Sequence, residues 1–238
     1  MPASLNLWQL GGIGIISTLL WLHYVQLKDR HQPEPRRRIL LAFLFGVFAC
    51  GLAWLAFFTL ERLGVPGLNP TDHRWTAVYC FLLIGPIEEL AKLLPARWFV
   101  FRWREYDEPM DGFVYSAAIA LGFASVENLL NSTHLNWPEQ LARAIALPLT
   151  HVLFSAVWGL GISYAHFHLP RSWWRGAWQL GSVLLAMLLH GLYDFLLFAY
   201  QATFVTSGLA LVLWLVVLWR VRIYANQALA SRVALPHN

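Results

Sequence analysis

The chain has 238 residues, of which 58% are hydrophobic and 13% are charged, and its net charge is +4. Soluble domains carry about 25% charged residues, so this composition excludes a soluble globule and predicts an integral membrane protein surrounded by lipids. The basic residues do not alternate with base-stacking aromatics, which excludes nucleic acid as a partner. Only Cys50 and Cys80 are present, both in apolar segments, so a disulfide framework and a cysteine-ligated zinc site are also excluded.

Apolar segments recur along the chain, each near the roughly 20 residues that cross a bilayer. The first segment has no basic residue before it, so we expect a retained span and not a cleaved signal peptide. The pattern predicts an all-α polytopic bundle of about seven transmembrane helices, forming one integral membrane domain over residues 1–238. The predicted spans lie near residues 6–26, 39–60, 75–95, 113–134, 140–165, 179–200 and 205–224.

The Lys and Arg residues predict the orientation of these spans. Most of the 17 basic residues lie in the stretches 27–38, 97–104 and 171–175 and in the tail from residue 220 onward. Cytoplasmic loops of membrane proteins are enriched in Lys and Arg. We therefore expect a protein of the bacterial inner membrane with its N-terminus outside and its C-terminus in the cytoplasm.

The third predicted span contains the stretch "GPIEELAKLLP" at 85–95, with Glu88, Glu89 and Lys92. A charge at the centre of a membrane helix costs roughly 3 kcal/mol or more, so such residues are functional candidates. Lys92 follows the two glutamates at i+4 and i+3, so either carboxylate can meet the ammonium on one helix face. We assign the catalytic base to Glu88 and the bracing of an adjacent span to Glu89. A purely structural ion pair is the competing interpretation.

Further polar residues lie within the later spans. Taken singly, a core histidine or an asparagine between helices has a structural explanation. The combination of several carboxylates and imidazoles on successive spans instead favours one shared site, and a helix kink at Pro86 or Pro148 would open space for it. We expect the helix that carries Glu127 to continue past Asn131, because the glutamate otherwise lies close to the helix end. The residues are Glu127, Asn128, His151, His190 and Asp194.

Four stretches in this order resemble the motifs of the PrsW family of intramembrane proteases, which is related to the CAAX prenyl endopeptidases. They are "EELAK" (88–92), "DGFVYSAAIALGFASVEN" (111–128), "LPLTH" (147–151) and "HGLYD" (190–194). The resemblance covers about residues 28–200. Glu127 stands where the prenyl endopeptidases have histidine, which favours the PrsW branch and makes a prenylated substrate less expected.

Carried over to this chain, the resemblance implies Glu88 and Glu89 as the catalytic pair and Lys92 as their cation. It implies Glu127 as the acid of the second motif, His151 as the histidine of the third, and His190 with Asp194 as its partner in the fourth. The expected activity is hydrolysis of a peptide bond in a membrane-anchored protein, with a single-span regulator of the anti-sigma type as the substrate class.

Two mechanisms fit these residues. In the first, Glu127, His151 and His190 hold a divalent ion, with zinc as the first candidate. Glu88 or Glu89 then activates water, and Lys92 or Asn128 assists the oxyanion. In the second, which needs no metal, a glutamate and a histidine activate water, while the other histidine and Asn128 bind the oxyanion.

Other functions also use polar residues within spans. A proton-coupled transporter or channel would use the Glu, His and Asp residues as a relay, although no matching pair of broken helices is evident. A haem-binding electron carrier would use His151 and His190 as axial ligands, which the surplus of carboxylates argues against. A non-catalytic membrane scaffold is the remaining alternative.

Overall fold

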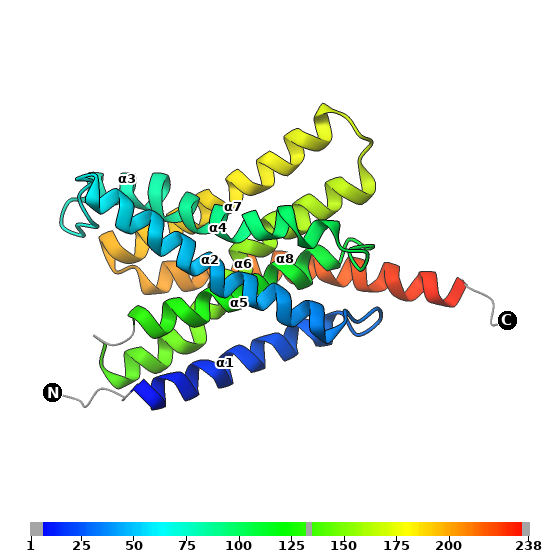
Figure 1. The fold of residues 1–238 in the computed structure, drawn as a ribbon, viewed down its shortest axis with the longest axis horizontal. Helices are drawn as coiled ribbons and strands as arrows, with labels where there is room; N and C mark the ends of the chain where they lie inside the picture. Colours follow the sequence, from blue (N-terminus) through cyan, green and yellow to red (C-terminus); the bar gives the residue numbers. More distant parts are fainter. Residues whose placement is uncertain (1–6, 132–134, 235–238) are drawn as a thin grey trace.

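The computed structural model describes residues 7–131 and 135–234 as a bundle of long helices (Figure 1). Five helices (α2, α5, α6, α7 and α8 as far as Gln227) are long and apolar enough to cross a membrane, and the described residues contain no strand. The predicted all-α membrane fold is confirmed, and the count of seven spans stays a prediction. The elements are α1 (Leu7–Lys28), α2 (Arg36–Arg62), α3 (His73–Val78), η1 (Tyr79–Ile84), α4 (Gly85–Trp98), η2 (Val100–Arg102), α5 (Asp111–Asn131), α6 (Trp137–His168), α7 (Trp173–Tyr200) and α8 (Thr203–Ala234).

The third predicted span is built from three consecutive pieces, α3, η1 and α4. Asp72 begins the first piece, because its side chain accepts the backbone N–H groups of Arg74 and Trp75 at 3.1 Å each. The middle piece, η1, is π-helical, a conformation that is rare and often found at functional sites. Pro86 follows at the start of α4, so the expected distortion lies directly before Glu88. At Pro148 the helix α6 continues to His168.

Helix α5 lies at the centre of the bundle and packs mainly against α2 and α6. The crossing with α2 depends on glycine: a Cβ at Gly46 would lie 1.9 Å from the carbonyl oxygen of Ile119, and one at Gly122 would lie 2.0 Å from that of Phe43. Small residues at such crossings let two backbones approach closely. This contact fixes α5, and with it the position of Glu127.

The two ends of the bundle carry different charge. Figure 1 shows the loops after α1, α4 and α6 at one end, together with the end of α8, and the loops after α2 and α7 at the other end with the start of α1. Most of the Lys and Arg residues lie in this first group of loops or in the helix ends that adjoin them. We call this end the basic end. The alternation of the loops between the two ends agrees with the predicted path of the chain through the membrane. The side of the membrane that each end faces stays a prediction.

The first basic loop is tied to α5. The carboxylate of Asp29 accepts the backbone N–H of Glu34 at 3.2 Å, and the hydroxyl of Tyr115 donates to the Glu34 carboxylate. Burial raises the pKa of Asp29 to about 8, because the charged form loses its hydration and lies near the negative charges of Glu34 and Glu108. A protonated Asp29 removes one negative charge from this loop at neutral pH.

Candidate active site

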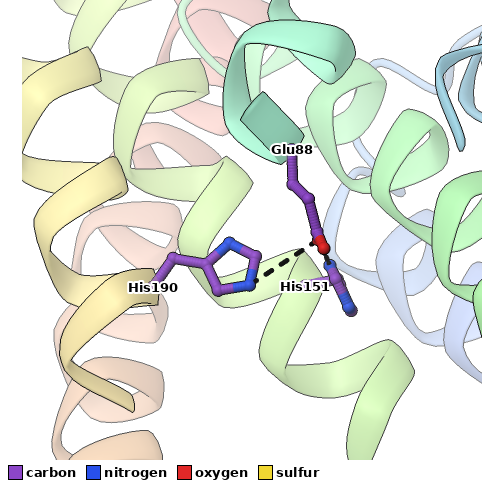
Figure 2. A group of neighbouring side chains, drawn as sticks. All are labelled: Glu88, His151 and His190. Carbon is purple, nitrogen blue, oxygen red and sulfur yellow. Dashed lines mark ion pairs between the residues drawn. The ribbon is translucent and has the colours of Figure 1, made fainter. Parts of the chain in front are cut away.

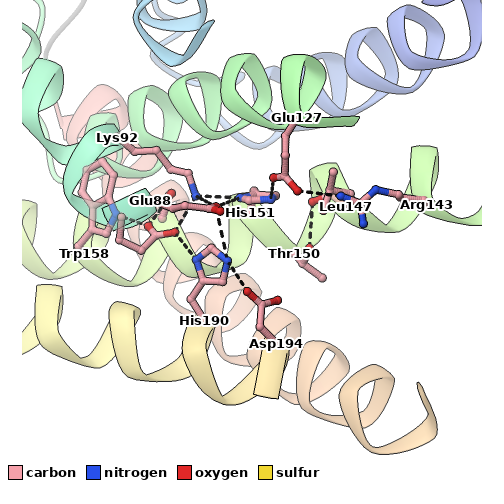
Figure 3. A network of polar contacts seen from close by, with 12 residues as sticks. Glu88, Lys92, Glu127, Arg143, Leu147, Thr150, His151, Trp158, His190 and Asp194 are labelled. Carbon is pink, nitrogen blue, oxygen red and sulfur yellow. Dashed lines mark hydrogen bonds and ion pairs between the residues drawn. The ribbon is translucent and has the colours of Figure 1, made fainter. Parts of the chain in front are cut away.

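The polar residues of the predicted spans come together between α4, α5, α6 and α7 (Figure 3). Helix α4 contributes Glu88, Glu89 and Lys92, and the other three helices contribute one or two residues each. Glu89 and Lys92 are completely buried, and both histidines of the group are nearly so. The convergence means that the charges compensate one another away from lipid. The group consists of Glu88, Glu89, Lys92, Glu127, Arg143, His151, His190 and Asp194.

Three side chains of this group face a common point (Figure 2). The Oε2 atom of Glu88 lies 4.0 Å from Nδ1 of His151 and 3.7 Å from Nε2 of His190. All three candidate ligand atoms lie within 4.8 Å of one another. Glu88 Oε2 is buried without a hydrogen-bond partner among the described residues, and an orphaned carboxylate oxygen beside two ring nitrogens suits a divalent ion.

The position of Glu127 differs from that expected for a metal ligand in the sequence analysis. Its Oε2 atom lies 2.8 Å from Nε2 of His151, the ring nitrogen that does not face Glu88. Glu88 therefore occupies the place in the group of three that the sequence analysis gave to Glu127. The structure describes α5 as far as Asn131, and residues 132–134, on which the expected extension of this helix depends, lie outside the described residues.

Glu89 has all its acceptor positions engaged. Oε1 accepts from Lys92 Nζ at 2.8 Å and lies 2.9 Å from Nδ1 of His190. Oε2 accepts from the Ser155 hydroxyl at 3.1 Å and from the Trp158 indole at 2.9 Å. These contacts join α4 to α6 and α7, as the bracing role requires.

Lys92 binds two members of the site at once. Its ammonium donates to Glu89 and to Nδ1 of His151, both at 2.8 Å, and lies 3.8 Å from Glu88 Oε2. It also lies 4.3 Å from the ring centre of Phe123, a favourable cation–π contact. Lys92 is therefore placed to neutralise the charge of one glutamate, as predicted, and Glu89 is the nearer of the two carboxylates.

A cavity of about 650 Å³ connects these residues with one end of the bundle. Glu88, His151, His190 and Asp194 are among its lining residues, as is Leu68 in the loop after α2. That loop is at the end of the bundle opposite the basic end (Figure 1). The volume falls within the range of about 300–1,000 Å³ usual for ligand sites. The cavity therefore gives the buried polar group a route to water.

Two further residues have distinct positions. Asp194 lines the cavity, and its Oδ2 atom is 3.5 Å from Nε2 of His190, as the i,i+4 spacing predicted. Asn128 is buried and lines a second cavity, between α1, α2, α5 and α6, and is not part of the lining shared by Glu88 and the histidines.

Sequence reasoning did not select Arg143 as a site residue. In the structure Arg143 belongs to α6, lines the cavity and donates to Oε1 of Glu127 at 2.8 Å. The signal that could have found it is its spacing, because Arg143 precedes His151 by about two helical turns and so lies on the same face.

The sequence profile of the PrsW family intramembrane metalloproteases matches residues 34–221 of the chain. The chain belongs to the PrsW family. It is 34% identical over 210 residues to Protease PrsW of Geobacillus kaustophilus (strain HTA426), an alignment that covers 88% of this chain and 89% of the relative. Protease PrsW of Bacillus subtilis (strain 168) is 31% identical over 186 residues, covering 78% and 81%. No solved structure matches the chain.

Membership in the PrsW family identifies the chain as an integral membrane peptidase with a protein substrate. This result favours the peptidase over the transporter, the haem carrier and the scaffold considered from the sequence. The family's printed description also names it as a metalloprotease family, and the group of Glu88, His151 and His190 is a set of residues in this PrsW-family chain that could hold such a metal.

Proposed function

We propose that this chain hydrolyses a peptide bond of a membrane-anchored protein with the help of a divalent ion held by Glu88, His151 and His190. The observation that carries the proposal is the orphaned Oε2 atom of Glu88, which faces both histidines at 4.0 and 3.7 Å. Zinc is the ion to test first, because a His/His/carboxylate set suits it. Bound there, zinc would polarise the scissile carbonyl and make a bound water more acidic.

Asp194 is the proposed general base. Glu89 is engaged by four donors, and Glu127 lies against Arg143 and His151, so neither carboxylate is free to take a proton from water. Asp194 lines the cavity on the side of His190 that faces the proposed ion site. This changes the role expected for Glu88, which the sequence analysis assigned as the base.

Lys92 is the proposed stabiliser of the oxyanion. Its ammonium lies 3.8 Å from Glu88 Oε2, so it is a cation adjacent to the place where the carbonyl oxygen becomes negative. If Nδ1 of His151 held the ion, the N–H of Lys92 that now points to it would be available to the substrate.

The proposed substrate is a single-span protein, of the anti-sigma type that the family resemblance implies, cut near the end of its helix. Backbone carbonyls within a transmembrane helix are hydrogen-bonded internally, and only the last turn leaves them free. The cavity is open toward one end of the bundle and includes Leu68 and Leu135 from connecting segments. A helix end therefore reaches the site with less unwinding than the middle of a helix.

A metal-free mechanism is the second candidate, and one contact favours it. Lys92 Nζ donates to Nδ1 of His151 at 2.8 Å, so the ammonium occupies the nitrogen that an ion would need. In this mechanism Glu88, whose Oε2 has no partner among the described residues, takes the proton from water. Lys92 keeps its place and His190 faces the oxyanion.

Glu88→Gln and Asp194→Asn separate the two mechanisms. The full chain is reconstituted in liposomes with tagged single-span proteins as substrates, and cleavage and bound zinc are measured per folded molecule. The ion mechanism predicts that Glu88→Gln loses zinc and cleavage. It predicts that Asp194→Asn keeps zinc and slows cleavage by about 100-fold or more. Glu61→Gln, at an exposed position near the end of α2, is the matched control.

The other outcomes are equally specific. A parent chain that cleaves without zinc, and that stops cleaving in Glu88→Gln, supports the metal-free mechanism. Parental cleavage by both variants means that the catalytic carboxylates lie elsewhere, and the proposal for this site fails.

A further inference from the structure

Arg143 connects the surface of the cavity with the buried His151. Its Nη2 atom donates to Oε1 of Glu127 at 2.8 Å, and the other oxygen of Glu127 lies 2.8 Å from Nε2 of His151 (Figure 3). Exposure falls along this row, because the side chain of Arg143 is 26% exposed, that of Glu127 17% and that of His151 3%. The row therefore runs from the cavity to the centre of the site.

The contact with Lys92 fixes which nitrogen of His151 carries the proton. An ammonium group has donors and no acceptor, so Nδ1 of His151 accepts from Lys92 through its lone pair. The proton of the neutral ring is then on Nε2, which faces the carboxylate of Glu127. Nδ1 is also the ring nitrogen that lies 4.0 Å from Glu88 Oε2.

His190 likewise has one ring nitrogen near a carboxylate and the other facing Glu88, and the cation that binds its carboxylate is Lys92. The Nδ1 atom of His190 lies 2.9 Å from Glu89, and its Nε2 atom faces Glu88. Each imidazole thus has a carboxylate behind it, and each carboxylate is bound by a cation: Lys92 for Glu89 and Arg143 for Glu127. Such carboxylate–histidine pairs orient the ring of a metal ligand and make it more basic.

We propose that Arg143 is a positioning residue that acts through Glu127 to hold His151 in the orientation the reaction needs. Glu89 has three donors besides His190, whereas within the described part of the chain Glu127 has Arg143 as its single donor apart from His151. Without the guanidinium, the partly exposed Glu127 can turn toward water in the cavity, and His151 loses the group behind Nε2.

The inference rests on the proposed ion site for its first test, which is zinc affinity. The solubilised full chain competes with a chelating dye for zinc, and Arg143→Gln and Glu127→Gln are each expected to weaken binding by about 10- to 100-fold. If Arg143 acts through Glu127, the double variant binds about as weakly as either single variant. Arg143→Lys keeps the charge and should retain much of the affinity. Arg74→Gln, at an exposed position in α3, is the control.

Parental zinc affinity in Arg143→Gln, or losses that add in the double variant, would overturn the inference. If the parent binds no zinc, the ion mechanism fails. The same single and double variants are then compared by their rates of cleavage of a single-span protein that the parent cuts. A lower kcat with unchanged KM, again without additivity, then supports positioning. A raised KM alone means that Arg143 binds substrate, and the inference fails.

Discussion

Glu88 and Glu89 are neighbours in the chain, yet their carboxylates have different surroundings. Consecutive residues of a helix point about 100° apart, so Glu89 faces α6 and α7 while Glu88 faces the cavity. Glu89 is fully buried and engaged by donors, whereas Glu88 Oε2 lacks a hydrogen-bond partner among the described residues. The spacing to Lys92 predicted a shared cation and left open which carboxylate would be nearer to it.

Glu89→Gln tests the bracing role at this scale. The change leaves the buried ammonium of Lys92 without its closest charge partner, and breaking a buried ion pair costs about 3–5 kcal/mol. We expect a clearly lower yield of folded protein and a lower midpoint of thermal unfolding in detergent. Trp158→Phe, which removes one of the donors to Glu89, should have a smaller effect of about 1–3 kcal/mol. A Glu89→Gln variant as stable as the parent would show that Glu89 is not a brace.

At the scale of elements, the site depends on how η1 and α4 pack against α7. A Cβ at Gly85 would lie 2.4 Å from the carbonyl oxygen of Met187, and one at Gly191 would lie 2.7 Å from that of Cys80. Both glycines thus lie where backbone meets backbone. Gly191 follows His190 directly, so the same close approach that joins the helices sets the distance from His190 to Glu88 and Glu89.

Gly191→Ala is expected to separate η1 from α7, because the new methyl group would overlap backbone atoms that cannot turn aside. Overpacking of this kind costs about 1–3 kcal/mol. Cleavage per folded molecule should fall as well, since His190 moves with the helix. Gly181→Ala in the same helix meets nothing within 4 Å, and should leave both measurements unchanged or slightly raise stability. Equal behaviour of the two variants would contradict the argument.

At the scale of the whole molecule, charge and cavity lie at opposite ends. Most of the Lys and Arg lie in the loops and adjoining helix ends of the basic end, and the cavity includes Leu68 and Leu135 from connecting segments at the other end (Figure 1). If Lys and Arg face the cytoplasm, the proposed site receives its substrate near the outer surface of the membrane. Orientation and place of cleavage are then linked.

Reporter fusions test this orientation. A reporter active only in the cytoplasm should be active when it is inserted in the loop 29–35 or after residue 238, and one inserted in the loop 63–72 should be inactive there. The expectation follows from the five Lys and Arg residues within 28–38, which includes this loop and the helix ends beside it, and from the three Arg residues from residue 220 onward. A cytoplasmic position for the loop 63–72 would reverse the predicted topology, and the substrate would then be cut on the inner side.

The sequence alone determined the class of the protein and most members of the candidate site. Apolar runs and basic loops are local features, because each span must satisfy its own backbone hydrogen bonds in lipid. Glu88, Glu89, Lys92 and His151 could be selected because a charge or an imidazole is conspicuous in such a run. The motif resemblance added the order of the four stretches, and the family assignment agrees with it.

Only the tertiary structure decided which atoms meet. Glu88, and not Glu127, completes the group with the two histidines, Arg143 belongs to the site, and Asn128 lines a different cavity. These facts depend on the rotation of each helix about its axis and on its distance from its neighbours. Both are set by contacts between residues far apart in the chain, such as the close approach of Gly191 to Cys80, and no local pattern in the sequence specifies them.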